Sequence, residues 1–250
     1  MFQRVSIFAC FLALTALFAA AGCNDNIGPA DNFDRQAMLR NYADNLIRPA
    51  YADLQTQTSA LLAAVESFNS NLTPLRLGSL QTAWGGAYVA WQYANAYNFG
   101  PAGEEGLRKG LIEEIGTFPA SELKIENVVG AGVWNMQDFN RDARGFLAIE
   151  YLIFGKNQTP EEIIQAFSQN PNRSDYLTAL AENLRDRVAE VTTAWNGTYR
   201  DEFVENDGTD AGSSTSALYN EFVRSYESIK NFKLGLPLGK RPRQTQAEPH

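Results

Sequence analysis

Arg144-Gly-Phe-Leu-Ala-Ile-Glu-Tyr-Leu-Ile-Phe-Gly155 is the segment around which we expect the rest of the chain to pack. Every residue between its two glycines is apolar or aromatic apart from Glu150. A helix formed by this segment has no polar face, so we expect it to be buried on all sides. The carboxylate of Glu150 must then be paired, hydrogen-bonded or protonated, because an unpaired buried charge costs several kcal/mol.

Glu150 can have either of two roles in such a helix. As a carboxylate in apolar surroundings it is a candidate functional group, since perturbed ionisable side chains gather at functional sites. The alternative role is structural, an ion pair with a nearby arginine, for which Arg141 and Arg144 are the candidates. The sequence leaves both roles open.

The composition limits the classes of function. The chain has 250 residues, of which 44% are hydrophobic and 20% charged, as is typical of globular proteins. Its formal net charge of −8 argues against nucleic acid as a partner. The one histidine, His250, is the final residue. Ser-His-Asp catalysis, Cys-His catalysis and a histidine-rich zinc site are therefore excluded from the folded part of the chain.

The N-terminus has the pattern of an export signal. Arg4 precedes an apolar run, Val5–Ala21, which ends in Ala-Gly-Cys23. This ending resembles the bacterial lipobox, although alanine stands where leucine is usual. It predicts a signal peptide over residues 1–22, a lipid on Cys23 and a polar tether over 23–31, so that a lipid anchor holds the protein on a membrane. The alternatives are an ordinary signal peptide cut near Ala21 and an uncleaved anchor.

The remainder predicts an all-α fold over residues 32–239, followed by a polar tail over 240–250. Apolar residues recur at helical spacing from about Asn32, and Pro49 should kink or split the first helix near Ile47 and Arg48. Thr73-Pro74 predicts the start of a helix that runs to about Tyr97. We expect an irregular bundle of about five to seven helices.

The second half of the domain has equally clear signals. Thr159-Pro160-Glu-Glu162 predicts a brief helix with a threonine cap. A long helix should begin near Ser174 and end at Trp195. The segment Ala102–Asn140 is punctuated by glycine and proline and is expected to be rich in loops with short helices, for which Leu107–Ile115 is a candidate. The last helix carries an apolar set, Leu218, Phe222, Tyr226 and Ile229.

An aromatic stripe marks the helix that starts at Pro74. Trp84, Tyr88 and Trp91 follow one another at steps of four and three residues, so they share a face. Packing in the core is the expected role of such a stripe, and stacking on a ligand is the alternative. Gly85-Gly86 within the helix predicts the close approach of another backbone.

Carboxylates remain the candidate metal ligands. Glu150 could act with Glu66, Asp138 or Asp142, and hard cations such as calcium or iron accept oxygen ligands. Sequence spacing does not choose among these combinations.

Three motifs together resemble the imelysin family of secreted or lipid-anchored bacterial helical proteins. They are the central segment, the Ala-Trp-x₆-Trp helix that ends in Asn98-Phe-Gly-Pro101, and Lys233-Leu-Gly-Leu-Pro-Leu-Gly239. The resemblance covers Asp34 to Gly239. It implies a helical bundle that is the first half of a two-bundle fold, with a ligand cleft between the halves, and it implies that this chain is a truncated product or a fragment.

The resemblance also implies a location and a role. The location is the bacterial cell envelope, lipid-anchored and periplasmic or outer-membrane. The role is a non-catalytic binding component linked to iron uptake, with iron or another divalent cation as the ligand, or with an iron-transport partner. The alternatives are a metal-dependent peptidase of this family and a structural accessory module for an outer-membrane transporter.

One position departs from the family's Gly-x-His-x-x-Glu motif. Gly145 and Glu150 match it, whereas Leu147 stands in the place of the histidine. A nitrogen ligand or general base is therefore absent there, and the metallopeptidase role loses its main support. Glu150, Gly145, Arg144 and Trp91 are the expected ligand-binding residues.

Overall fold

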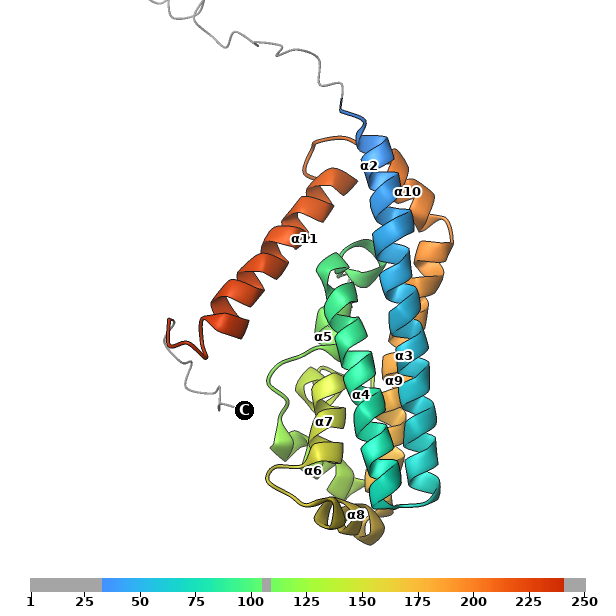
Figure 1. Ribbon diagram of the computed structural model, residues 1–250, viewed down its shortest axis with the longest axis vertical. Coiled ribbons are helices and arrows are strands. Elements are labelled where there is room, and N and C mark those ends of the chain that lie inside the picture. The colour runs from blue at the N-terminus through green and yellow to red at the C-terminus, as the bar shows by residue number, and fades with distance from the viewer. Residues whose placement is uncertain (1–32, 105–108, 241–250) are drawn as a thin grey trace, which may run out of the picture. The chain divides into compact units, whose positions relative to one another are not determined.

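The structure, a computed structural model, describes residues 33–104 and 109–240 and is all-α over them, as predicted (Figure 1). The predicted signal peptide, the tether with Cys23, and the tail beyond Lys240 lie outside these residues. The α-helices are α2 (Arg35–Tyr42), α3 (Arg48–Ser70), α4 (Pro74–Ala94), α5 (Leu111–Ile115), α6 (Glu122–Ala131), α7 (Phe146–Phe154), α8 (Pro160–Gln169), α9 (Pro171–Asn196), α10 (Tyr199–Glu205) and α11 (Ser214–Ser228).

There are more helices than the five to seven expected, because short ones occupy the segments that carry few sequence signals. Helices α5 and α6 lie in the loop-rich stretch before residue 140, and α10 follows the long α9. Among the described helices, none is both long enough and apolar enough to span a bilayer. The chain divides into two units, residues 1–34 and 35–250, and the structure describes only Phe33 and Asp34 of the first.

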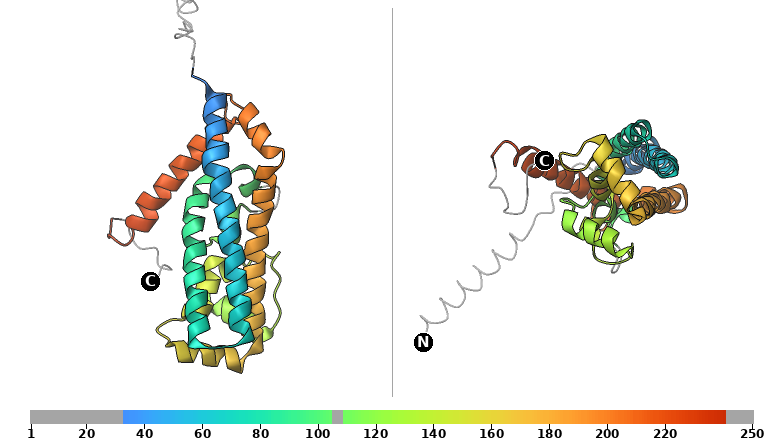
Figure 2. Two further views of the ribbon diagram at one scale, coloured as in Figure 1. Left: turned by 45° about the vertical axis from the view of Figure 1, so that its right-hand side comes forward. Right: turned by 90° about the horizontal axis from the view of Figure 1, so that it is seen from below.

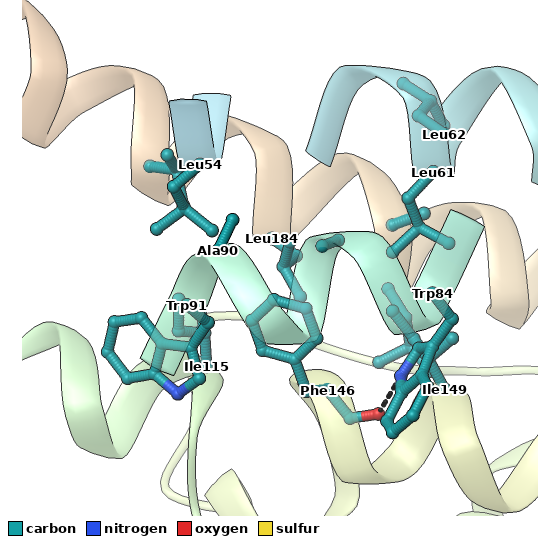
Figure 3. Close-up of a cluster of buried hydrophobic side chains, with 14 of the residues drawn as sticks. Leu54, Leu61, Leu62, Trp84, Ala90, Trp91, Ile115, Phe146, Ile149 and Leu184 are labelled. Carbon is teal, nitrogen blue, oxygen red and sulfur yellow. Dashed lines mark hydrogen bonds between the residues drawn. The ribbon is translucent and has the colours of Figure 1, made fainter. Parts of the chain in front are cut away.

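Three long helices form the centre of the second unit. Helices α3, α4 and α9 lie side by side, and α3 packs on both of the others (Figure 2). Their facing side chains are fully buried, including Leu54 and Leu61 of α3 and Leu184 of α9 (Figure 3). Helices of this length bury one apolar face each, and that burial is the main source of their stability.

Prolines and capping side chains set the helix starts where the sequence predicted them. Thr73 accepts a hydrogen bond from the backbone N–H of Arg76, and Pro74 occupies the first turn of α4. Thr159 and Glu162 form a complete capping box at α8. Asn170 caps α9 three to four residues earlier than the predicted start near Ser174, because Pro171 is compatible with a first helical position.

Pro49 splits the first helix as predicted. A π-helical segment, Ala43–Ile47, separates α2 from α3, and Pro49 lies in the first turn of α3. The backbone N–H of Arg48 bonds to the carbonyl of Ala43, five residues back. A wider turn fits here because proline lacks the N–H of a regular α-helical bond and its ring presses on the preceding turn.

The interpretation of Gly85-Gly86 is wrong. A Cβ atom added at Gly85 would meet no atom within 4 Å, and one at Gly86 would meet only the side chain of Gln57 at 3.1 Å. Neither glycine is therefore required by an approaching backbone.

Helix α7 is not buried on all sides, contrary to the prediction. Phe146, Ile149 and Ile153 are buried where α7 packs against α4 and α9. Its opposite face reaches the surface, and it consists of Leu147, Glu150, Tyr151 and Phe154, the last of which is 38% exposed. These four residues recur at helical spacing and share one side of the helix. The sequence did not predict this open face, because three of the four residues on it are apolar or aromatic.

Candidate functional site

The backbone turns sharply where the chain enters α7. Gly145 has φ +77° and ψ −162°, a combination that is essentially restricted to glycine. A Cβ atom at this position would lie 2.4 Å from the carbonyl oxygen of Ile115. Gly145 is thus the point at which the start of α7 closes against the end of α5, so its role in this fold is to permit that contact.

A buried ion cluster lies beside this contact. The guanidinium of Arg144, which is 3% exposed, donates to the carboxylate of Glu114 at 2.8 Å. Arg141 binds the other oxygen of Glu114 at 3.2 Å. The Nη1 group of Arg144 donates to the backbone carbonyls of Met136 at 2.6 Å and Asp138 at 3.1 Å. The two arginines that the sequence offered as partners of Glu150 are therefore both bound to Glu114.

The aromatic stripe of α4 packs against α7, as expected for a core stripe. The indole N–H of Trp84 donates to the carbonyl of Phe146 at 3.0 Å (Figure 3). Trp91, 3% exposed, stacks on the ring of Phe146 with their centroids 6.3 Å apart. The edge of the Trp91 indole also lies against Gly116, where an added Cβ would come within 3.1 Å of it. Trp91 is thus held within the packed interior.

Glu150 lies at the surface that α4 and α7 share. Burial, followed by the negative charge of Glu150, raises the pKa of Tyr88, while a hydrogen bond with Gln92 opposes the rise. The carboxylate is therefore close enough to act on the Tyr88 hydroxyl, which remains protonated at neutral pH. Lys233, in the π-helical segment Ile229–Leu234, donates to the side-chain oxygen of Gln92 at 2.6 Å.

These contacts define what we call the Glu150 face: Glu150, Tyr88, Gln92 and Lys233. It offers a carboxylate, a phenol, an amide and an ammonium group, drawn from three separate elements. Of the four residues predicted to bind a ligand, Gly145, Arg144 and Trp91 are buried and Glu150 alone is partly open to solvent. The sequence missed Tyr88 as a polar partner of Glu150 because the aromatic periodicity of α4 concerns the ring of Tyr88 and not its hydroxyl.

On the opposite flank of α7, Tyr151 joins a different set of charges. Burial and a hydrogen bond with Glu126 raise the pKa of Tyr151 to about 12. Glu126 in turn accepts from Arg173 of α9 at 2.9 Å. This cluster connects α6, α7 and α9, so the hydroxyl of Tyr151 has a structural role.

The other candidate carboxylates do not gather around Glu150 to form a metal site. Asp142 is paired with Lys124 at 2.8 Å, and Asp138 caps the turn at Asn140. Glu66 is exposed on α3. Within residues 33–104 and 109–240, no three acidic, histidine or cysteine side chains lie close enough to hold an ion together. The described residues thus do not fit a resident iron or other divalent cation, which needs several fixed ligands.

Comparisons of sequence confirm the resemblance that the motifs indicated. Residues 47–249 match the family model of imelysin. The iron-regulated protein A of Synechococcus elongatus is 23% identical to this chain over 253 residues, a match that covers 94% of this chain and 63% of that protein.

Comparisons of structure confirm the fold. An imelysin-like protein from Psychrobacter arcticum superposes with a TM-score of 0.67 at 17% identity, covering 82% of this chain and 64% of its own. A protein described as an iron-regulated protein A precursor, from Parabacteroides distasonis, gives a TM-score of 0.66 at 17% identity, covering 89% of this chain and 67% of its own. This chain therefore spans 63% of the curated relative and 64% of the first solved structure.

Proposed function

The chain belongs to the imelysin family, and on that premise we propose that it is a binding component of the bacterial cell envelope that takes part in iron acquisition and cleaves no peptide bond. Its binding surface is the Glu150 face. The link to iron is supported by relatives named as iron-regulated proteins.

The observation that carries this proposal is the position of Glu150 on the open side of α7. Its carboxylate lies beside the neutral phenol of Tyr88, and a polar chain continues through Gln92 to Lys233. Such a surface presents both signs of charge and several hydrogen-bonding groups. Because these residues do not complete a metal site, the ligand that suits them is iron already held in a chelate, with polar groups of its own.

The identity of residue 147 supports binding over catalysis. A metallopeptidase needs fixed metal ligands and an activated water. Leu147 lies one turn before Glu150 on the same face and supplies neither a ligand nor a base.

Replacing Glu150 with glutamine should weaken binding of ferric citrate at least about tenfold, since a hydrogen bond to a charged group contributes about 1.5–3 kcal/mol. We expect the free energy of unfolding to fall by less than about 1 kcal/mol, because the side chain is partly open to water. Quenching of tryptophan fluorescence measures the binding, since Trp84 stacks on Tyr88 with centroids 4.9 Å apart. A thermal melt measures the stability.

Glu66→Gln is the matched control, because Glu66 is an exposed carboxylate on α3. It should leave both measurements unchanged. If Glu150→Gln lowers the free energy of unfolding by about 3–5 kcal/mol and leaves ferric citrate binding unaltered, Glu150 is one half of a structural ion pair. Zinc-dependent or iron-dependent cleavage of casein that Glu150→Gln abolishes would instead establish the peptidase.

The anchoring of the protein rests on Cys23. We expect Cys23→Ala to block processing or to release the protein from the membrane fraction, because the lipid-bearing residue is lost. The word precursor in the description of the Parabacteroides distasonis relative supports export. Mass spectrometry of the mature N-terminus tests the site directly. An unmodified N-terminus at another residue contradicts lipidation of Cys23.

A further inference from the structure

Helix α4 holds the backbone of α7 at two points, one on each side of Glu150. The indole N–H of Trp84 donates to the carbonyl of Phe146 at 3.0 Å (Figure 3). The side-chain N–H of Gln81 donates to the carbonyl of Ile153 at 2.8 Å. Phe146 comes four residues before Glu150, and Ile153 comes three residues after it. Glu150 therefore lies between two hydrogen-bonded points of attachment to α4.

The bond from Gln81 satisfies a carbonyl at the end of a helix. An α-helix leaves its last four carbonyls without a partner inside the helix. Helix α7 ends at Phe154, so the carbonyl of Ile153 is one of these four. Gln81 thus supplies a donor where α7 itself supplies none, and it fixes the C-terminal end of α7 to α4.

Apolar packing alone does not fix how α7 is turned against α4. Phe146, Ile149 and Ile153 are buried in this contact, and apolar contacts are non-directional. A slip of one residue turns an α-helix by about 100°, which would carry Glu150 away from the side where Tyr88 lies. Hydrogen bonds are directional. Two of them, at the two ends of α7, therefore set both its rotation and its register.

Trp84 also fixes the ring of Tyr88. The two rings are stacked, with centroids 4.9 Å apart and planes 10° from parallel, and the ring of Phe146 meets Tyr88 at a steep angle with centroids 5.5 Å apart. The carbonyl that Trp84 binds is also the one that accepts the backbone N–H of Glu150 in an α-helix. Trp84 therefore contacts both the ring of Tyr88 and the helical turn that leads to Glu150.

From this arrangement we propose that Gln81 and Trp84 are positioning residues of the Glu150 face. Their two hydrogen bonds to the backbone of α7 set the carboxylate of Glu150 beside the hydroxyl of Tyr88, so that both groups meet one ligand together. The ligand is that of the proposed function, on which this role of Gln81 and Trp84 rests. The contacts that define the role lie between α4 and α7.

Gln81→Met tests the positioning without a ligand, because methionine has the length of glutamine and no N–H donor. Burial and then the charge of Glu150 raise the pKa of Tyr88. The pKa of Tyr88 should therefore fall in Gln81→Met and at least as far in Glu150→Gln. Combining the two substitutions should lower it no further than Glu150→Gln alone. Carbon NMR of tyrosine labelled at the hydroxyl-bearing carbon measures the titration, and Tyr88→Phe assigns the signal.

Gln57→Met is the matched control. Gln57 is a partly buried glutamine of α3, and its side chain bonds within its own helix to Asp53 at 3.4 Å. This variant should leave the pKa of Tyr88 unchanged. Trp84→Phe removes the other bond to α7 and keeps an aromatic ring against Tyr88. It should lower the pKa of Tyr88 as Gln81→Met does.

Calorimetry extends the test to ferric citrate, because Trp84→Phe removes a fluorescent ring. Gln81→Met should weaken binding about two- to tenfold, the effect of one hydrogen bond, and should weaken it no further when Glu150→Gln is already present. The proposal is overturned if the pKa of Tyr88 is unchanged in Gln81→Met or in Trp84→Phe, or if the effects of Gln81→Met and Glu150→Gln add. If both substitutions shift the titration as expected and neither alters ferric citrate binding, the positioning stands and the proposed function fails.

Discussion

Replacing Glu114 with glutamine should lower the free energy of unfolding by about 3–5 kcal/mol, the cost of breaking a buried ion pair by removing one partner. Glu114 is 5% exposed and binds both Arg141 and Arg144. Without the charge of Glu114, the guanidinium of Arg144 stays in the interior with two backbone carbonyls and the more distant carboxylate of Asp138, 3.8 Å away, as its partners. Urea unfolding followed by circular dichroism measures the loss.

The neighbouring carboxylate is a matched control. Glu113 precedes Glu114 on α5 and is exposed. Glu113→Gln should change the free energy of unfolding by less than about 0.5 kcal/mol, as is usual for a surface substitution. Equal urea midpoints for the two variants would contradict the structural role that the distances assign to Glu114.

Gly145→Ala is expected to destabilise the protein by about 3 kcal/mol or more, from two sources. A residue with a side chain is strained by about 1–3 kcal/mol in the backbone conformation of Gly145. The added Cβ would also lie 2.4 Å from the carbonyl oxygen of Ile115, and relieving that overlap moves backbone at a further cost of about 1–3 kcal/mol. The start of α7 should shift away from α5, and a thermal melt records the effect.

Gly85→Ala is the control for this substitution and should act in the opposite direction. Gly85 lies within α4, and a Cβ there would meet nothing within 4 Å. Alanine should raise the free energy of unfolding by about 0.5–1 kcal/mol, because it loses less backbone entropy than glycine in a helix. If Gly145→Ala and Gly85→Ala lower the free energy of unfolding by similar amounts, neither the overlap with Ile115 nor the backbone angles of Gly145 explain the destabilisation.

Much of the helical layout could be predicted from local signals. The missing N–H of proline and the hydroxyl of threonine act within one turn of their own positions, so Thr73, Pro74, Thr159 and Pro160 marked helix starts that the structure confirms. Pro49 marked the split before α3 in the same way. The short helix α10 lacks such signals and was not predicted, whereas α5 lies within the possible short helix Leu107–Ile115.

The candidate site could be predicted only in part. The sequence identified Glu150 as the exceptional residue of α7, and it predicted that Trp84 and Trp91 pack in the core. It could not identify Glu114 as the partner of Arg144, since thirty residues separate them and their pairing depends on where α5 lies. Tyr88 and Gln92 were missed for the same reason.

The sequence by itself determined the all-α class, the positions of the main helix starts and the two glycines that bound α7, because each follows from sterics and hydrogen bonding between neighbours in the chain. The tertiary structure alone decided which side of α7 stays open, which carboxylate neutralises Arg144, and that α11 attaches by Glu221 and Arg224 and leaves Phe222 outside. The physical reason is distance along the chain, because burial and ion pairing depend on elements that are remote in the sequence. The identity of an apolar residue does not show whether another helix will cover it.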